Sequence, residues 1–346
     1  MWRLLILSIL SLLMLVGTGI GLAQDEAGSI VLNRAKFYVQ AGEYDKALRL
    51  YSGFLRLNPD NIDALVQRAV VYASIDDFPS AFDDINTAFD LAGFSAIKQA
   101  VIYDGRGQVY FMEGSAELSL QDFSRAIELD SGTPDYWLNR ATWYQVARDW
   151  DNALADYQQY AMLRPDDSEA YLNIARVYLV LDDLNATIEA LNSAIEINPY
   201  DPELYIFRGS INLQNKQVAA AAVDYSNWMQ IINVNIVEQD LLVDKTAELD
   251  LTMSYGTVHH VSFNANSGDR LGVVAKSTGV DSLVVLLDPN GKPIMADDDG
   301  GQGLNAFIID FALPDDGTYT LWIGHARGGW NGRIELTVQI VPAEGV

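Results

Sequence analysis

The stretch PDYWLNRATWYQVARDWDNALADYQQYAMLRP, residues 134–165, decides the fold. In it the small residue Ala141 precedes Tyr144 by three places, and the small residue Ala153 precedes Tyr157 by four. Residues three or four apart share one face of an α-helix, so each pair marks one amphipathic helix. Pro165 lacks an amide hydrogen and ends the second helix. The stretch therefore predicts a helix-turn-helix unit.

The same unit recurs along the chain. The steps between the small residues of successive first helices are 34, 38, 34, 34 and 34 residues. A fixed period in this range predicts a stacked solenoid, with function on surfaces rather than in a pocket. The first-helix pairs are Ala35/Tyr38, Ala69/Tyr72, Gly107/Tyr110, Ala141/Tyr144, Ala175/Tyr178 and Gly209/Asn212. The second-helix pairs are Ala47/Tyr51, Ala81/Ile85, Ser119/Phe123, Ala153/Tyr157, Thr187/Leu191 and Ala221/Tyr225.

These residues resemble the tetratricopeptide repeat over about Gly28 to Ile232, with units that start near 28, 62, 100, 134, 168 and 202. The resemblance implies an all-α solenoid over residues 28–240 that binds protein segments. Two departures stand out: four extra residues around Gly93 to Lys98, and Asn212 in place of tyrosine in the sixth unit. We expect a local bend at the first and a capping role for the second.

Charges recur in step with the repeat. An arginine precedes the small residue of the first helix in five units, and an aspartate stands sixteen places later in four of those five. We expect an ion pair between the two helices of each such unit, although two independent solvated charges fit the pattern as well. The expected structural pairs are Arg68/Asp84, Arg106/Asp122, Arg140/Asp156 and Arg208/Asp224.

The concave side of such a solenoid is lined by its first helices and is the usual binding face. Asparagine amides there can donate to and accept from a peptide backbone without selecting its sequence. Only two cations, Lys36 and Arg176, face the same side, which disfavours recognition of a terminal carboxylate. The alternative is that the asparagines only solvate the face. The candidate residues are Asn33, Lys36, Gln67, Gln108, Asn139, Thr142, Asn173 and Arg176.

Net charge and the first residues indicate where the protein works. The formal net charge of −25 excludes nucleic acid as a partner, because phosphate binding needs a basic face. Residues 1–23 resemble a signal peptide: Arg3 precedes an apolar run, and small residues end at Ala23. We expect export to a periplasmic, cell-surface or extracellular site. The alternative is an uncleaved membrane anchor. With no cysteine, disulfides are excluded.

The pattern of apolar and polar residues changes after Asp240. Helical periodicity stops there, and short segments in which apolar and polar residues alternate predict strands. About eight strands are expected over residues 241–346, in a β-sandwich of jelly-roll-like type. The clearest are Leu271–Ala275, Leu283–Leu287, Ala306–Phe311, Thr318–Ile323 and Arg333–Ile340. The runs Asp288-Pro289-Asn290-Gly291 and Leu313-Pro314-Asp315-Asp316-Gly317-Thr318-Tyr319 resemble the bacterial pre-peptidase C-terminal domain, which implies a non-catalytic module of secreted proteins.

Two binding functions are open for the carboxyl-terminal region. Carboxylates at Asp288, Asp297, Asp298 and Asp299 can offer oxygen ligands to calcium, and a solvated turn is the alternative. Trp322, Trp330 and Tyr255 are candidates for a platform that stacks on glycans or peptides, against ordinary edge packing.

No catalytic set is recognisable. The sequence has no HExxH, no GxSxG and no glycine-rich phosphate loop, and His259 and His260 are adjacent, so in a strand they point to opposite faces. We therefore expect a non-enzymatic scaffold with protein partners, without a cofactor and with no small-molecule substrate evident. The rival hypothesis is a calcium-linked or glycan-binding module carried on a repeat spacer.

Overall fold

The computed structural model describes residues 26–232, 235–240, 246–254, 256–298, 305–325 and 331–343. It divides into two compact units, Met1–Leu181 and Asp182–Val346. The sequence-based boundary at Asp240 therefore does not coincide with the division by compactness, which groups the last three helices with the strands. None of the helices in the described ranges is long and apolar enough to cross a membrane.

In the described residues, twelve helices precede the strands and alternate as the first and second helices of six units. Those of the first compact unit are α2 (Glu26–Gln40), α3 (Tyr44–Leu57), α4 (Ile62–Ser74), α5 (Phe78–Ala92), α6 (Ala96–Glu113), α7 (Ala116–Leu129), α8 (Pro134–Ala147), α9 (Trp150–Leu163) and α10 (Ser168–Val180). Those of the second are α11 (Leu184–Ile197), α12 (Pro202–Gln214) and α13 (Val218–Ile232). Helical hairpins are confirmed as the building block of residues 28–232.

The helix starts follow local chemistry. Asn61, Asp77, Asp149, Asp183 and Asp201 each precede a helix and accept a hydrogen bond from an amide of its first turn. Such caps satisfy amide groups that have no partner within the helix. The recurrence of Asp or Asn at this place, two to four residues after the previous helix, explains the regular length of the units.

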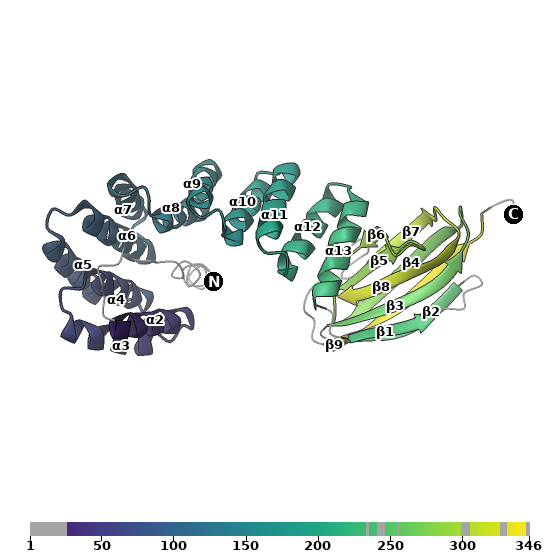
Figure 1. Ribbon diagram of the computed structural model, residues 1–346, viewed down its shortest axis with the longest axis horizontal. Helices are drawn as coiled ribbons and strands as arrows, with labels where there is room; N and C mark the ends of the chain where they lie inside the picture. Colours follow the sequence, from purple (N-terminus) through teal and green to yellow (C-terminus); the bar gives the residue numbers. More distant parts are fainter. Residues whose placement is uncertain are drawn as a thin grey trace. The chain divides into compact units, whose positions relative to one another are not determined.

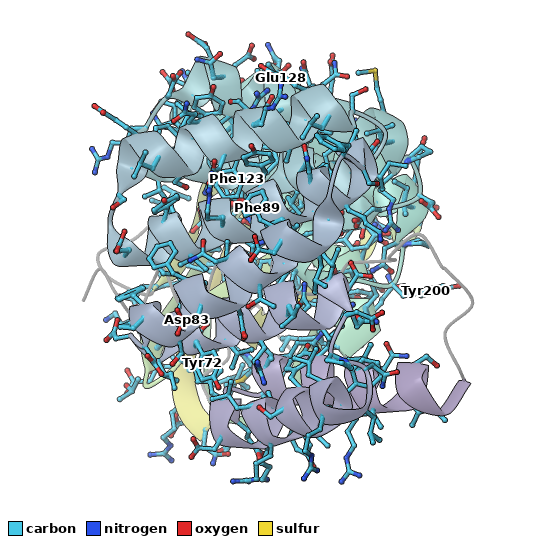
Figure 2. The ribbon with its side chains drawn as sticks, turned by 90° about the vertical axis from the view of Figure 1, so that its left-hand side faces the viewer. Tyr72, Asp83, Phe89, Phe123, Glu128 and Tyr200 are labelled. Atoms are coloured by element: carbon cyan, nitrogen blue, oxygen red, sulfur yellow. The ribbon has the colours of Figure 1, made fainter. Side chains whose placement is uncertain are left out.

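Helices interlock through the small positions. Ala81, Ala141 and Ala153 are fully buried. Glycine at the same slot marks an even closer approach: a Cβ on Gly107 would lie 2.8 Å from the Phe123 ring, and one on Gly209 would lie 2.7 Å from the Tyr225 ring. In the side view of Figure 2 Phe123 and Phe89 lie among the helices, and the Phe89 ring meets the Tyr103 ring edge-on at 5.1 Å.

The four extra residues of the third unit lengthen a helix. Helix α6 has 18 residues and begins four residues before the position where the repeat register would start it, at Ala100. The insertion adds one helical turn, and Gly93, with φ of 54°, ends the preceding helix.

Nine strands in the described ranges form two sheets. Their bounds are β1 (Asn235–Asp240), β2 (Thr246–Ser254), β3 (Thr257–Ala265), β4 (Arg270–Thr278), β5 (Ser282–Leu287), β6 (Pro293–Asp297), β7 (Ala306–Ala312), β8 (Gly317–His325) and β9 (Asn331–Val341). One sheet has the order β1-β3-β8-β5-β6 and the other β2-β9-β4-β7. All five expected strand segments lie within observed strands, and Ile334, Leu336, Val338 and Ile340 of β9 are buried as the alternation predicted.

A core between the sheets explains most of the burial in this region. Side chains from both sheets form one apolar cluster, among them Leu286 and Leu321 of the five-stranded sheet and Val273 and Leu336 of the four-stranded one. The intervening residues of β5, Leu283, Val285 and Leu287, are buried too but lie outside that cluster. Helix α13 packs on β5 and β6 (Figure 1), and this accounts for a strand that is apolar on both faces.

Candidate functional site

A repeated ion pair joins the two helices of four units. The shortest nitrogen–oxygen distances are 2.7 Å for Arg68–Asp84, 2.6 Å for Arg106–Asp122, 2.7 Å for Arg140–Asp156 and 2.5 Å for Arg208–Asp224. Each guanidinium donates through Nε and Nη2 to the carboxylate, and all four aspartates are buried. Paired, desolvated charges of this geometry hold helices together more firmly than exposed pairs do.

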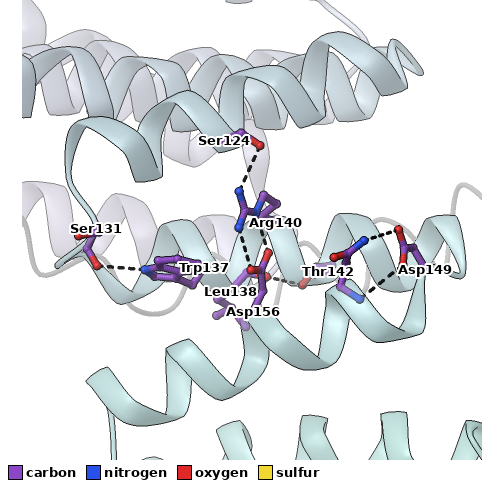
Figure 3. Close-up of polar contacts among 9 residues, drawn as sticks. Ser124, Ser131, Trp137, Leu138, Arg140, Thr142, Asp149 and Asp156 are labelled. Carbon is purple, nitrogen blue, oxygen red and sulfur yellow. Dashed lines mark hydrogen bonds and ion pairs between the residues drawn. The ribbon is translucent and has the colours of Figure 1, made fainter.

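The arginine also reaches the preceding unit. Arg140 Nη1 donates to Ser124 Oγ at 3.2 Å while its other nitrogens hold Asp156 (Figure 3). Arg68 makes the same link to Ser52, and Arg208 to Asn192. The acceptor stands sixteen residues before the arginine each time, just as the aspartate stands sixteen after it. Sequence reasoning missed this link between units, although the sixteen-residue spacing between the polar residue and the arginine can be read from the sequence.

Aromatic rings frame the same arginines. The guanidinium of Arg140 lies 5.3 Å from the Trp137 ring centre and 5.8 Å from that of Tyr144. Arg106 lies 4.9 Å from the Phe89 ring. In the first four units the tyrosine three places after the small residue therefore packs against the cation, which gives a physical reason for the tyrosine in those units.

The first helices form the inner side of the first compact unit, where α2, α4, α6 and α8 lie inside the arc of second helices (Figure 1). Asp104 on α6 is 8% exposed and accepts hydrogen bonds from Asn139 Nδ2 and Gln108 Nε2. Burial raises the pKa of Asp104 to about 7, against the lowering effect of both amides. Asn139 and Gln108, two predicted binding residues, thus donate their amide hydrogens to a buried carboxylate of the solenoid.

Asp135 at the start of α8 is the least satisfied carboxylate on this side. Its Oδ1 atom is buried and has no hydrogen-bond partner among the described residues. Burial raises the pKa of Asp135 to about 6, and the positive charges of Arg164 and Lys36 act in the opposite direction. Sequence reasoning did not select Asp104 or Asp135, although both stand on first helices beside positions that it did select.

The remaining predicted binding residues differ in how they are engaged. Thr142 is buried and donates to the Leu138 carbonyl of its own helix (Figure 3). Asn173 accepts from Arg176, which also pairs with Glu169 at 2.8 Å. Asn33 is exposed, and Lys36 and Gln67 are half-buried. The predicted set therefore does not form a row of free amides: Asn139 and Thr142 are buried and bond within the solenoid, a role that neither the binding nor the solvating interpretation described.

The carboxylates proposed for calcium are engaged in other contacts. Asp288 accepts from the amides of Asn290 and Lys292, and Asp297 accepts from the Phe307 amide. Asp298 accepts from the Tyr225 hydroxyl at 2.6 Å. Asp299 lies outside the described residues, within which no group of three metal-ligating side chains is arranged for a metal ion. The calcium site stays a prediction.

Only Trp322 of the three residues predicted for an aromatic platform lies in the described part of the chain. Tyr255 and Trp330 lie outside it. Trp322 stacks on His260 at 4.8 Å between ring centres, and His260 contacts Glu238 of β1 at 2.9 Å. His259, on the opposite face, contacts the Thr252 carbonyl at 3.0 Å. These contacts occupy one face of the indole with a neighbouring side chain.

Comparisons with known proteins point to one kind of repeat. Residues 29–71 and 138–202 match two family models, both described as tetratricopeptide repeat. A human protein called tetratricopeptide repeat protein 16 is 21% identical over 66% of this chain and 32% of its own length. A DnaJ homolog subfamily C member 7 homolog from Schizosaccharomyces pombe is 23% identical over 83% of this chain and 62% of its own length. The chain thus spans about one to two thirds of these relatives.

Solved structures show a weaker likeness. A thermophilic tetratricopeptide repeat protein from Thermus thermophilus is 22% identical, covers 54% of this chain and 99% of its own, and has a TM-score of 0.44.

Proposed function

Since the chain is a tetratricopeptide repeat protein, we propose that it is a non-enzymatic scaffold that binds segments of partner proteins along the inner side of its first helices. Solenoids of helical hairpins present an extended curved surface rather than a closed pocket. Such a surface suits a chain segment. The buried aspartates and arginines of the ion pairs serve to hold the units in register and contribute no ligand contact.

The observation that carries the proposal is the pair of poorly compensated carboxylates, Asp104 and Asp135. Asp104 is buried with amide partners and makes no ion pair among the described residues. Asp135 leaves one buried oxygen unpartnered within the same described part of the chain. The positive charges of Arg164 and Lys36 only partly offset the cost of burying the Asp135 carboxylate, and a cationic side chain supplied by a ligand would offset more of that cost. The bound segment therefore carries lysine or arginine.

Export and the role of the sandwich are further parts of the proposal. The apolar leader with its small residues before Ala23 supports secretion with removal of residues 1–23. The motifs Asp288 to Gly291 and Leu313 to Tyr319 support a bacterial pre-peptidase C-terminal-like module that docks to another surface. Sequencing the amino terminus of the secreted form tests the leader: a first residue of Gln24 is expected, and an intact Met1 contradicts it.

Binding is tested with residues 24–346 and a library of random peptides displayed on phage. Retained peptides are expected to be enriched in lysine and arginine. The Asp135→Asn variant should lose this enrichment, because it removes the carboxylate charge and preserves the shape. Asp83→Asn is the matched control, since Asp83 is an exposed aspartate of a second helix (Figure 2) and its replacement changes net charge equally. No enrichment, or an equal loss in both variants, contradicts the proposal.

A further inference from the structure

Helix α2 exposes the side on which the later first helices pack against the unit before them. Ile30 is 64% exposed and Phe37 is 62% exposed. The residues that correspond to Ile30 in the second to sixth units, Ala64, Ile102, Tyr136, Ala170 and Leu204, are at most 5% exposed. Those that correspond to Phe37 in the second, third, fifth and sixth units, Val71, Val109, Val177 and Ile211, are at most 3% exposed. A surface that is covered inside the solenoid is thus open at its first helix.

Two polar residues on the same side of α2 stand at positions that contact the preceding unit elsewhere. Asn139, the counterpart of Asn33 in the fourth unit, donates to a carboxylate of the preceding first helix α6. Arg140, the counterpart of Arg34, donates to a serine hydroxyl of the preceding second helix α7 at 3.2 Å. Asn33 and Arg34 are exposed. They therefore point toward the place that a preceding unit would occupy.

The four exposed residues form one self-complementary face. Ile30, Asn33, Arg34 and Phe37 follow the spacing i, i+3, i+4 and i+7, which places them on one side of a helix. Their order is apolar, amide, cation, apolar. A second copy of α2 that lies antiparallel, about a two-fold axis between residues 33 and 34, brings Ile30 opposite Phe37 and Asn33 opposite Arg34. A two-fold interface requires this kind of self-complementary surface.

A contact between asparagine and arginine across two packed helices already occurs inside the solenoid. Arg208 Nη1 of α12 donates to Asn192 Oδ1 of α11 at 2.6 Å. Arg34 lacks the carboxylate that four later arginines use, because Leu50 stands where their aspartate would be. Its Nη2 atom donates to the Tyr38 hydroxyl at 3.2 Å, and a guanidinium has five N–H donors. Arg34 can therefore also donate to the amide oxygen of Asn33 on a second copy.

Charge favours the first unit as the place where two copies meet. The formal net charge of the chain is −25, and residues 62–201 contain 24 acidic and 8 basic side chains. Residues 28–61 contain three acidic and five basic side chains. Two copies that approach each other through the second to fifth units bring strongly negative surfaces together, which is unfavourable. The first unit carries only a small positive excess, so the repulsion is weaker there.

We propose that two copies of the chain associate through this face of α2, as an antiparallel helix pair with two-fold symmetry. Ile30 packs on Phe37 of the other copy at both ends of the contact, and Asn33 accepts from Arg34 of the other copy at its centre. A single helix pair is smaller than a standard protein interface, so the dimer is weak and depends on concentration. The inference does not depend on binding along the inner side of the first helices.

Disulfide trapping tests the register directly, because the sequence has no cysteine. Full chains with Ile30→Cys are mixed with full chains that carry Phe37→Cys and a mass tag, and are oxidised in mild detergent. Two copies of position 30 would lie about 10 Å apart along the helices, too far for a disulfide. The mixed disulfide should exceed either same-residue disulfide by about fivefold or more, against about twofold for random pairing. Leu57→Cys on α3, at 84% exposure, is the control and should not link to position 30.

Exchanging the two central residues tests the polar contact. In both cysteine chains, Asn33→Arg places like charges opposite each other and should lower the yield of the mixed disulfide about tenfold or more. Adding Arg34→Asn exchanges the two residues, restores the match and should recover the yield. Asn86→Arg, at an exposed position of α5, adds the same charge and should leave the yield unchanged. Random pairing of the cysteines, or a double variant no better than Asn33→Arg alone, overturns the proposal.

Discussion

The hydroxyl of Tyr225 on α13 donates to Asp298 Oδ2 at 2.6 Å, across 73 positions of sequence, and so joins the last helix to the turn after β6. In the other units the residue at this position fills the slot of its own first helix. Tyr225 does so too, against Gly209, and also extends its hydroxyl to the sheet region. Met229 lies against Gly324 and Trp228 meets the His325 ring at 6.1 Å. The sixth unit is thus ended by a sheet rather than by a seventh helix pair.

Replacing Tyr225 with phenylalanine should destabilise the second compact unit by about 1.5–3 kcal/mol, the range for hydrogen bonds to charged groups. Tyr51→Phe is the matched control, because Tyr51 is equally buried but its hydroxyl has no hydrogen-bond partner among the described residues. Removing the Tyr51 hydroxyl should leave the free energy of unfolding unchanged or raise it. Urea unfolding of both variants gives the two values, and equal destabilisation would show that the Asp298 contact contributes nothing.

The arginine pairs should be more sensitive than surface charges. Arg140→Ile leaves Asp156, which is 4% exposed, without its cation, and should cost about 2–4 kcal/mol in unfolding free energy. Adding Asp156→Ala should recover much of the loss, since the fifth unit naturally has Ile174 and Ala190 at these places. A double variant no more stable than the single one would count against this interpretation. Arg125→Ile breaks the exposed pair with Glu128 and should change stability by about 0.5 kcal/mol or less.

Helix periodicity and strand alternation are properties of single segments, and this is why the sequence predicted the hairpins and the strands well. The four-residue insertion was placed correctly, but sequence alone did not show that it continues α6 by one turn. The hydrogen bond between Asn139 and Asp104 spans 35 residues and depends on how two helices pack. Such contacts between units decide which polar residues of a first helix stay free, and no pattern within one unit contains that information.

Replacing Gly107 of α6 and Gly53 of α3 with alanine should change the stability of the protein in opposite directions. Gly107→Ala places a Cβ 2.8 Å from Phe123 in a packed interior and should cost about 1–3 kcal/mol. Gly53→Ala in the middle of α3 meets nothing closer than the end of the Arg56 side chain at 4.0 Å and should stabilise by up to about 1 kcal/mol. Thermal unfolding of both variants tests this difference in sign.

Stability should fall as the pH rises from 4 to 7, because the folded chain holds protons on Asp104 and Asp135 that the unfolded chain has released. The folded pKa of Asp104 is raised to about 7 and that of Asp135 to about 6. The unfolded value is near 4, so the unfolded state binds fewer protons in this window and the free energy of unfolding decreases with pH. Asp104→Asn should remove about 2–4 kcal/mol of this decrease. Urea unfolding at pH 5 and pH 8 measures it, and an unchanged difference would contradict the burial of a titrating Asp104.

Binding along the inner side of the first helices is the central claim, and site-specific photo-cross-linking tests it most directly. A photoreactive amino acid is placed at Asp63, an exposed position on first helix α4, or at Asp83, an exposed position on second helix α5, in residues 24–346. A lysine- and arginine-containing peptide selected by the chain is then added and irradiated. Cross-links are expected from position 63 and none from position 83. Cross-linking from position 83 alone, or equally from both, would contradict it.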